Sequence, residues 1–271
     1  MKNINWDKKY KRLFTFGCSF TRYMWPTYAC LLNKHFLPEQ YANAGRPGAG
    51  SLLCISRLTQ ANRYFKFDEN DLIVIMYPSY TREDRFTDTA WDCHGNIFTS
   101  RTFDKEFLRK YGHMSHYILR DFALIDTIQG YLKNLKSDSI QLMSVPHTGL
   151  EEYTYYPEDQ LEVLTRMQDR YSNLFTNFAK DYTTFLLDTN NTGIQNGWGH
   201  EYDGLIDPHP RPTIALEYLK YLGLDPKQEV IDFANDSDRE LSKLKTRKEV
   251  TDFYHNYNEE LDWCMKHYIL I

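Results

Sequence analysis

The sequence predicts an α/β fold in which a parallel sheet is covered by helices on both faces. Short apolar and β-branched segments alternate along the chain with longer amphipathic segments, which is typical of βαβ units. The clearest strand, DLIVIMYP (71–78), has five consecutive apolar residues, the pattern of a strand buried on both faces. Crossover connections between such strands are right-handed, so the strands are expected to be parallel.

The elements of the first half follow from the same patterns. Residues 12–17 predict the first strand, because β-branched and aromatic residues run up to Gly17. Residues 21–36 predict a helix with an apolar stripe, and Pro26 is tolerated there because it lies in the first turn. The remaining predicted elements are a short strand with a Gly-rich loop (40–51), a helix (52–65) and the strand at 71–78.

The second half contains an insertion and an extension. Residues 79–112 are polar, aromatic and irregular, and they interrupt the alternation. We therefore expect one domain over 1–225 with an insertion at about 79–112, and a charged helical extension over 226–271. The regular elements predicted between them are a helix (113–136), a strand (139–146), a helix (158–180), a strand (183–188) and a helix (212–223).

Composition narrows the class of protein. A net charge of -5 without a long basic run argues against a nucleic-acid partner. The five cysteines are widely spaced without a CxxC pair, which indicates a reduced intracellular protein. Without an apolar run of signal or membrane-spanning length, we expect a cytoplasmic protein with no membrane association. The 21 tyrosines indicate binding surfaces or compositional drift, and the Tyr- and Asn-rich style would suit a viral protein.

Chemistry-bearing residues follow several predicted strands, and the carboxyl ends of parallel strands share one rim of the sheet. In FGCSFT, Ser19 follows the first strand at a predicted helix N-terminus, where it is a nucleophile, a helix cap or both. In DGLIDPHPRP, Asp207 and His209 offer the acid and base that a nucleophilic serine needs, in a loop stiffened by prolines; the alternative is that His209 is a loop histidine without a role. NAGRPGAGS (43–51) is either an ordinary turn or the source of an oxyanion-binding N–H group.

These segments, in this order, resemble the SGNH hydrolases, also called GDSL-like esterases, from the first strand to residue 222. The resemblance implies a three-layer, flavodoxin-like α/β/α fold and an esterase that needs no cofactor. FGCSFT resembles the first motif, with Ser19 as the nucleophile, and DPHP resembles the last, with Asp207 and His209. NAGRPGAGS resembles the second motif, and its spacing makes Gly48 the oxyanion glycine.

The third motif of the family departs from its pattern here. The family has an oxyanion-binding asparagine after the central strand, but this strand runs into MYPSYTREDR. Ser79 or Thr81 can donate a hydroxyl hydrogen bond in its place, and Arg82 can donate a charged one to an oxyanion or an anionic substrate. The alternative for Arg82 is an ion pair with Glu83 or Asp84.

Other candidates have simpler interpretations. His113 and His116 are three residues apart without an HExxH pattern, so we expect surface histidines and no metal site. Cys18, beside Ser19, is expected to point into the core. Asp203 is an alternative to Asp207 as the orienting acid, although the family spacing favours Asp207.

The substrate is expected to be a small-molecule or glycan ester, with an O-acetyl group on a carbohydrate as the first hypothesis. Trp198 and the Tyr-rich segments 77–80 and 153–156 either stack on sugar rings or pack under long loops. Two alternatives use the same residues differently: a non-catalytic binding or structural protein on a decayed SGNH fold, and an O-acyltransferase. The sequence makes no prediction of oligomeric state.

Overall fold

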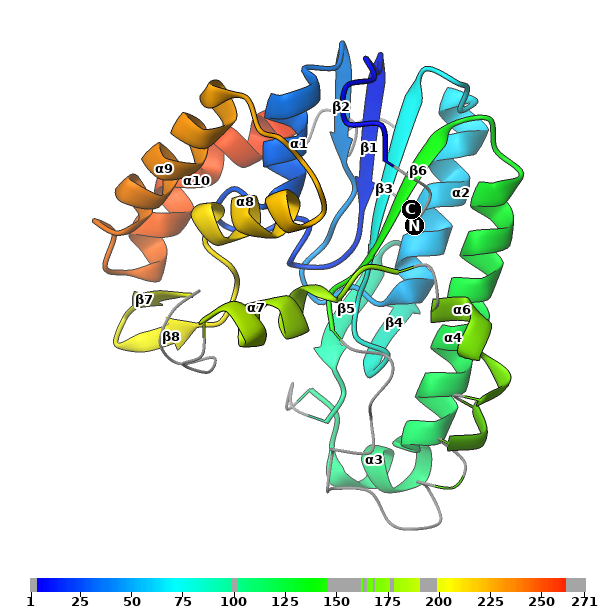
Figure 1. The fold of residues 1–271 in the computed structure, drawn as a ribbon. Helices are drawn as coiled ribbons and strands as arrows, with labels where there is room; N and C mark the ends of the chain where they lie inside the picture. The colour runs from blue at the N-terminus through cyan, green and yellow to red at the C-terminus, as the bar shows by residue number, and fades with distance from the viewer. Residues whose placement is uncertain are drawn as a thin grey trace.

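The computed structural model describes residues 4–98, 102–145, 162, 165–167, 169–175, 178–190 and 199–261. A four-stranded sheet with the order β2-β1-β3-β6 lies at its centre (Figure 1). All three strand pairs are parallel, as expected. The strands are β1 (Arg12–Phe16), β2 (Gln40–Asn43), β3 (Asp71–Tyr77) and β6 (Asp138–Met143).

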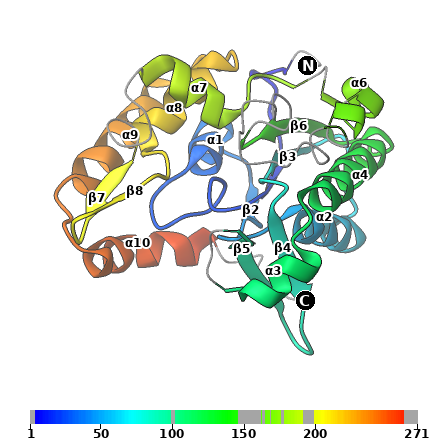
Figure 2. The ribbon, with the colours of Figure 1, turned by 90° about the horizontal axis from the view of Figure 1, so that it is seen from below.

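Helices cover both faces of this sheet, which confirms the predicted α/β fold. Alternate residues of β3 point to opposite faces: Val74 joins a core with α1 and α8, whereas Ile75 joins a core with α2 and α4. Figure 2 shows these two helix pairs on the two sides of the strands. The helices are α1 (Tyr28–Phe36), α2 (Ser51–Phe65), α4 (Met114–Lys133) and α8 (Pro212–Tyr221).

The insertion contains regular structure, although the sequence suggested an irregular segment. It forms the antiparallel hairpin of β4 (Arg82–Phe86) and β5 (Trp91–Asn96), followed by α3 (Lys105–Tyr111). The hairpin contacts the N-terminus of α2, where Asp84 accepts hydrogen bonds from the backbone of Gly50 and Leu53. The insertion is rich in polar residues, and the buried carboxylate of Asp84 attaches it to the α/β domain.

The predicted extension is helical in its described part. It contains α9 (Gln228–Leu241) and α10 (Arg247–Leu261), and Val230 and Ala234 of α9 join the core formed by α1 and α8. Before it, β7 (His200–Tyr202) and β8 (Leu205–Asp207) form a second antiparallel hairpin. Within the described part of the chain, no helix has both the length and the apolarity needed to cross a membrane.

The helix predicted at 21–36 is wrong in its first part, because α1 begins only at Tyr28. The residue before a proline is disfavoured in the helical region, so Pro26 keeps Trp25 out of a helix. Residues 18–22 instead form a turn in which the Cys18 carbonyl accepts the backbone N–H groups of Thr21 and Arg22.

The strand predicted at 183–188 is also wrong, because these residues belong to α7 (Tyr182–Asn190). Asp181 caps this helix by accepting the Thr184 N–H at 2.9 Å. Tyr182, Phe185 and Leu186 are buried at helical spacing, whereas Leu187 is 45% exposed. The helix predicted at 158–180 is confirmed in part: the described residues are helical at 162, 165–167, 169 and 170 and in α6 (Ser172–Phe175), whereas 178–180 are not helical.

Candidate active site

Ser19 lies in the turn that follows β1 and is almost fully buried, with 5% of its surface exposed. It does not lie at a helix N-terminus as predicted, because the chain runs through the loop before α1. Ser19 is therefore not a helix cap. Among the described residues its backbone N–H meets no acceptor, and the same holds for the N–H of Gly48.

Asp207 and His209 form a hydrogen-bonded pair at the end of β8. His209 Nδ1 lies 2.6 Å from Asp207 Oδ1, and the His209 backbone N–H donates to the same oxygen at 3.0 Å. A carboxylate only accepts, so Nδ1 carries the proton and Nε2 of the neutral ring carries the lone pair. This tautomer is the one that a general base acting through Nε2 requires.

Two tyrosines hold the other oxygen of Asp207. Tyr202 donates to Asp207 Oδ2 at 2.6 Å, and Tyr23 donates to the same oxygen. Burial and the hydrogen bond to Asp207 together raise the pKa of Tyr202 to about 12. The Tyr202 hydroxyl therefore stays protonated and can donate. Burial alone would raise the pKa of Asp207, but the bonds from His209, Tyr202 and Tyr23 outweigh it and lower that pKa to about 2. Asp207 is thus ionised at neutral pH.

Ser19 and His209 line the same small pocket. Tyr23 stacks on the His209 ring with the ring centroids 3.7 Å apart, and Phe20 meets it edge-on at 5.6 Å. Among the residues that the structure describes, no hydrogen bond joins Ser19 to His209. The pocket is lined by Ser19, Phe20, Tyr23, Thr27, Tyr28, Tyr182, His209, Pro210 and Ala215.

Asp203, the alternative acid, serves another purpose. Its carboxylate accepts the Arg247 N–H at 2.9 Å, and its own N–H donates to Lys245 O at 2.8 Å. Its φ of +52° closes the turn between β7 and β8. Asp203 therefore ties the hairpin to the extension, and Asp207 is the carboxylate that contacts His209.

The Gly-rich loop is tied to the Ser19 turn. Asn43 accepts the Gly45 N–H at 3.0 Å and donates to Thr21 O at 2.9 Å. Gly48 has a φ of +81°, and a Cβ there would lie 2.6 Å from the Cys93 carbonyl oxygen, so this position requires glycine. Gly48 is not among the residues that line the pocket.

The candidates for the missing asparagine follow β3. Ser79 Oγ and Thr81 Oγ1 lie 2.9 Å apart, and Thr81 is buried. Arg82 makes no ion pair within the described part of the chain, so its predicted pairing with Glu83 or Asp84 is wrong. Glu83 pairs instead with Arg85 and Arg120. None of the three candidates lines the pocket.

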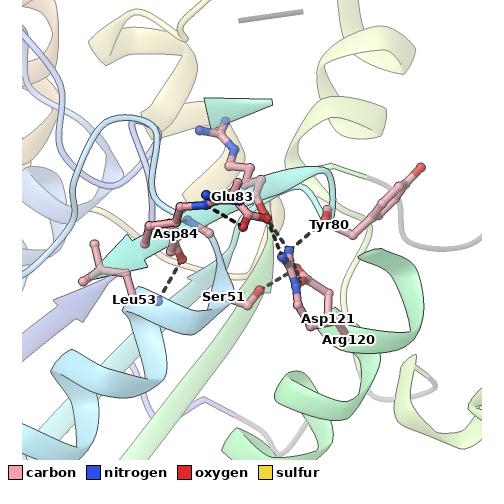
Figure 3. A network of polar contacts seen from close by, with 10 residues as sticks. Ser51, Leu53, Tyr80, Glu83, Asp84, Arg120 and Asp121 are labelled. Atoms are coloured by element: carbon pink, nitrogen blue, oxygen red, sulfur yellow. Dashed lines mark hydrogen bonds and ion pairs between the residues drawn. The ribbon is translucent and has the colours of Figure 1, made fainter. Parts of the chain in front are cut away.

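A buried polar network holds the insertion to the domain (Figure 3). Asp84 accepts the N–H groups of Gly50 and Leu53 at 2.7 and 2.9 Å, which satisfies the start of α2. Arg120 joins the hairpin to α4 by donating to Arg82 O at 2.6 Å and to Asp121 at 2.8 Å. The hairpin that follows the central strand is therefore fixed against the Gly-rich loop.

The remaining predicted residues have simple outcomes. Cys18 is 1% exposed, which confirms that it points into the core. His113 immediately precedes α4, and in the described ranges no three His, Cys, Asp or Glu side chains gather as metal ligands. Trp198 and segment 153–156 lie outside the described residues.

The aromatic partners of the pair were not predicted from the sequence. Tyr23 and Phe20 lie close to Ser19 in the chain, but the predicted helix over 21–36 assigned Tyr23 no contact with the distant Asp207. Tyr202 carried one usable signal. It lies five residues before Asp207, and the intervening DG pair is typical of a tight hairpin, which brings residues on either side of it together.

No protein-family model and no curated protein matches this chain. Among solved structures, it is similar to an acetylxylan esterase from Geobacillus stearothermophilus, with 13% identity, a TM-score of 0.40 and coverage of 83% of this chain and 98% of that one. A second similar structure, a member of the lipolytic protein G-D-S-L family from Veillonella parvula, has 14% identity, a TM-score of 0.36 and coverage of 77% and 96%. Both of these solved structures are SGNH/GDSL-family proteins.

Proposed function

We propose that this protein is a serine esterase of the SGNH type. The observation that carries the proposal is the 2.6 Å bond between Asp207 and His209, next to a pocket that Ser19 also lines. A serine, a histidine in the required tautomer and an ionised aspartate are the three groups of a serine hydrolase. Their order along the chain is that of the SGNH motifs.

The proposed reaction proceeds through an acyl-enzyme. Ser19 Oγ attacks the ester carbonyl while His209 Nε2 takes its proton, and His209 then returns the proton to the departing alcohol. Water, deprotonated by His209, then attacks the acyl carbon, and His209 returns that proton to Ser19 Oγ as the bond between Ser19 and the acyl group breaks. Asp207 keeps the imidazole in its tautomer and stabilises the cation that forms. A hydrogen bond from serine to base often tightens only when substrate binds, so the lack of one here is compatible with this role.

The oxyanion requires donors near Ser19. In the proposal these are the backbone N–H groups of Ser19 and Gly48, and both lack an acceptor among the described residues. Ser79, Thr81 or Arg82 supplies the donor that the missing asparagine provides elsewhere in the family. Each such donor typically contributes about 100- to 1,000-fold in rate.

The proposed substrate is an O-acetyl ester of a carbohydrate. Phe20, Tyr23 and Tyr182 wall the small pocket, so it suits a short acyl group better than a long chain. Aromatic faces of this kind also stack on sugar rings. Trp198 is proposed as a further stacking residue.

Hydrolysis of p-nitrophenyl acetate by purified protein tests the activity. We expect turnover in the wild type, loss of it in Ser19→Ala and His209→Ala, and retention in Cys18→Ala, whose thiol is buried beside Ser19. Equal trace hydrolysis in all four proteins would refute the esterase and favour a non-catalytic binding protein. A rate that falls from acetate to octanoate, and acetate release from an acetylated oligosaccharide, would support the substrate class.

A further inference from the structure

The residues that follow His209 are hydrogen-bonded to Asp238, a carboxylate of the C-terminal extension. Asp238 of α9 accepts from Arg211 Nε with one oxygen and from the Thr213 hydroxyl with the other, both at 2.6 Å. The side chains of Asp238 and Arg211 are 14% and 28% exposed, so water screens this ion pair less than it screens a fully exposed pair. Both oxygens of one α9 carboxylate therefore hold the residues that follow His209.

The same loop is held from another side by an indole that the extension buries. Trp25 Nε1 donates to Pro210 O at 2.9 Å, and Pro210 directly follows His209. Trp25 is 1% exposed. The other fully buried residues of its cluster come from α9 and α10: Leu241, Val250 and Tyr254.

The hairpin that carries Asp207 is also hydrogen-bonded to the extension. His200 Nε2 donates to Leu244 O at 2.9 Å, and Asp203 N donates to Lys245 O at 2.8 Å. These two residues lie on the β7–β8 hairpin, which presents Tyr202 and Asp207. The connection between α9 and α10 thus fixes the strand pair that carries the acid (Figure 2).

We infer that the C-terminal extension positions the acid–base pair, with Asp238, Trp25 and Tyr202 as the positioning residues through which it acts. The inference rests on the proposed function, because alignment of the pair affects rate only if His209 transfers protons. Misplacement of a reacting group by about 1 Å can cost about 100-fold in rate. Since none of the three side chains reacts, their loss is expected to lower kcat and leave KM nearly unchanged.

The test uses full-length variants that keep the shape of the side chain: Asp238→Asn and Tyr202→Phe. Asp236→Asn on the same helix is the matched control, because Asp236 is exposed and, among the described residues, pairs only with the neighbouring Arg239. The readouts are kcat and KM with p-nitrophenyl acetate, the melting temperature, and the downfield proton NMR resonance of the His209 ring N–H that bonds Asp207. That resonance is assigned by its loss in Asp207→Asn.

We expect folded Asp238→Asn and Tyr202→Phe with kcat lower by about 10- to 100-fold, KM within about twofold and a shifted or broadened ring resonance, whereas Asp236→Asn matches the wild type. Lower melting temperatures with unchanged kcat and an unchanged resonance would overturn the inference. If Asp238→Asn fails to fold, Thr213→Val decides, because it removes a single hydroxyl that bonds the extension at Asp238. If the wild type lacks esterase activity, the proposed function fails, and the resonance still tests the positioning.

Discussion

The carboxylate of Asp121 is predicted to make the stability of this protein depend on pH. Asp121 is fully buried in α4, where it accepts from the Ser51 hydroxyl and from Arg120, both at 2.8 Å (Figure 3). Burial raises the pKa of Asp121 to about 7 against the opposing effects of Arg120 and Ser51, and the nearby Asp84 adds to the rise.

The sign of the effect follows from this direction. A carboxyl whose pKa is higher in the folded state favours folding when it is protonated. Its stabilising contribution is complete below the unfolded pKa near 4 and is lost as the pH rises through 7. For these two pKa values, the loss between about pH 5 and pH 8 is about 2 to 3 kcal/mol.

Urea unfolding of wild type, Asp121→Asn and Asp126→Asn at both pH values measures this contribution. Asparagine does not titrate, so Asp121→Asn is expected to lose less free energy of unfolding than the wild type between pH 5 and pH 8. The expected difference is about 2 to 3 kcal/mol. Asp126, an exposed aspartate of the same helix, provides the control and is expected to follow the wild type. An equal pH dependence in all three proteins would show that Asp121 is already ionised at pH 5, and the reasoning would fail.

Three further predictions concern the loops around the site. Gly48→Ala is expected to lower the free energy of unfolding by about 1 to 3 kcal/mol in urea titrations, because residue 48 has a positive φ and the added Cβ would meet the Cys93 carbonyl oxygen. Gly130→Ala on α4 is the control: its Cβ would point into open space, so no loss of stability is expected. Asp84→Ala is expected to cost about 1 to 3 kcal/mol by leaving two buried N–H groups at α2 without an acceptor, and a loss no larger than that of exposed Asp88→Ala would contradict this role. Asp207→Asn is expected to lower kcat about 10,000-fold, since the amide favours the wrong tautomer of the ring, and a near-normal kcat on p-nitrophenyl acetate would refute that role.

The sequence predicted the sheet and the acid–base pair because both depend on local patterns. The apolar run of β3 has one interpretation in a globular chain, and Asp207 and His209 are so close in sequence that their contact needs only a stiff loop. The strand predicted at 183–188 failed because Thr, Phe and Leu suit either structure, and only the cap at Asp181 and the packing of Tyr182 decide for a helix.

The contacts that cross the fold were not accessible from local patterns. Tyr23 and Asp207 are far apart in the sequence, and their bond depends on how α1 is entered, which Pro26 sets. The network around Asp84 depends on the hairpin folding back onto α2. Both contacts are made by loops or turns that pack against distant parts of the chain. Such segments lack the hydrophobic periodicity from which helices and strands are predicted.

The two segments outside the regular alternation hold opposite halves of the proposed site. The insertion fixes the Gly-rich loop, through Asp84 at α2 and through the bond from Gly95 N–H to Gly48 O at 3.2 Å. The extension fixes the loop of His209 through Asp238. A chain reduced to the α/β core would keep the bond of Asn43 to Gly45 but lose the contacts that Asp84, Gly95 and Asp238 make with the two loops. In the proposed mechanism, changes in the insertion are therefore expected to affect oxyanion stabilisation, and changes in the extension to affect proton transfer.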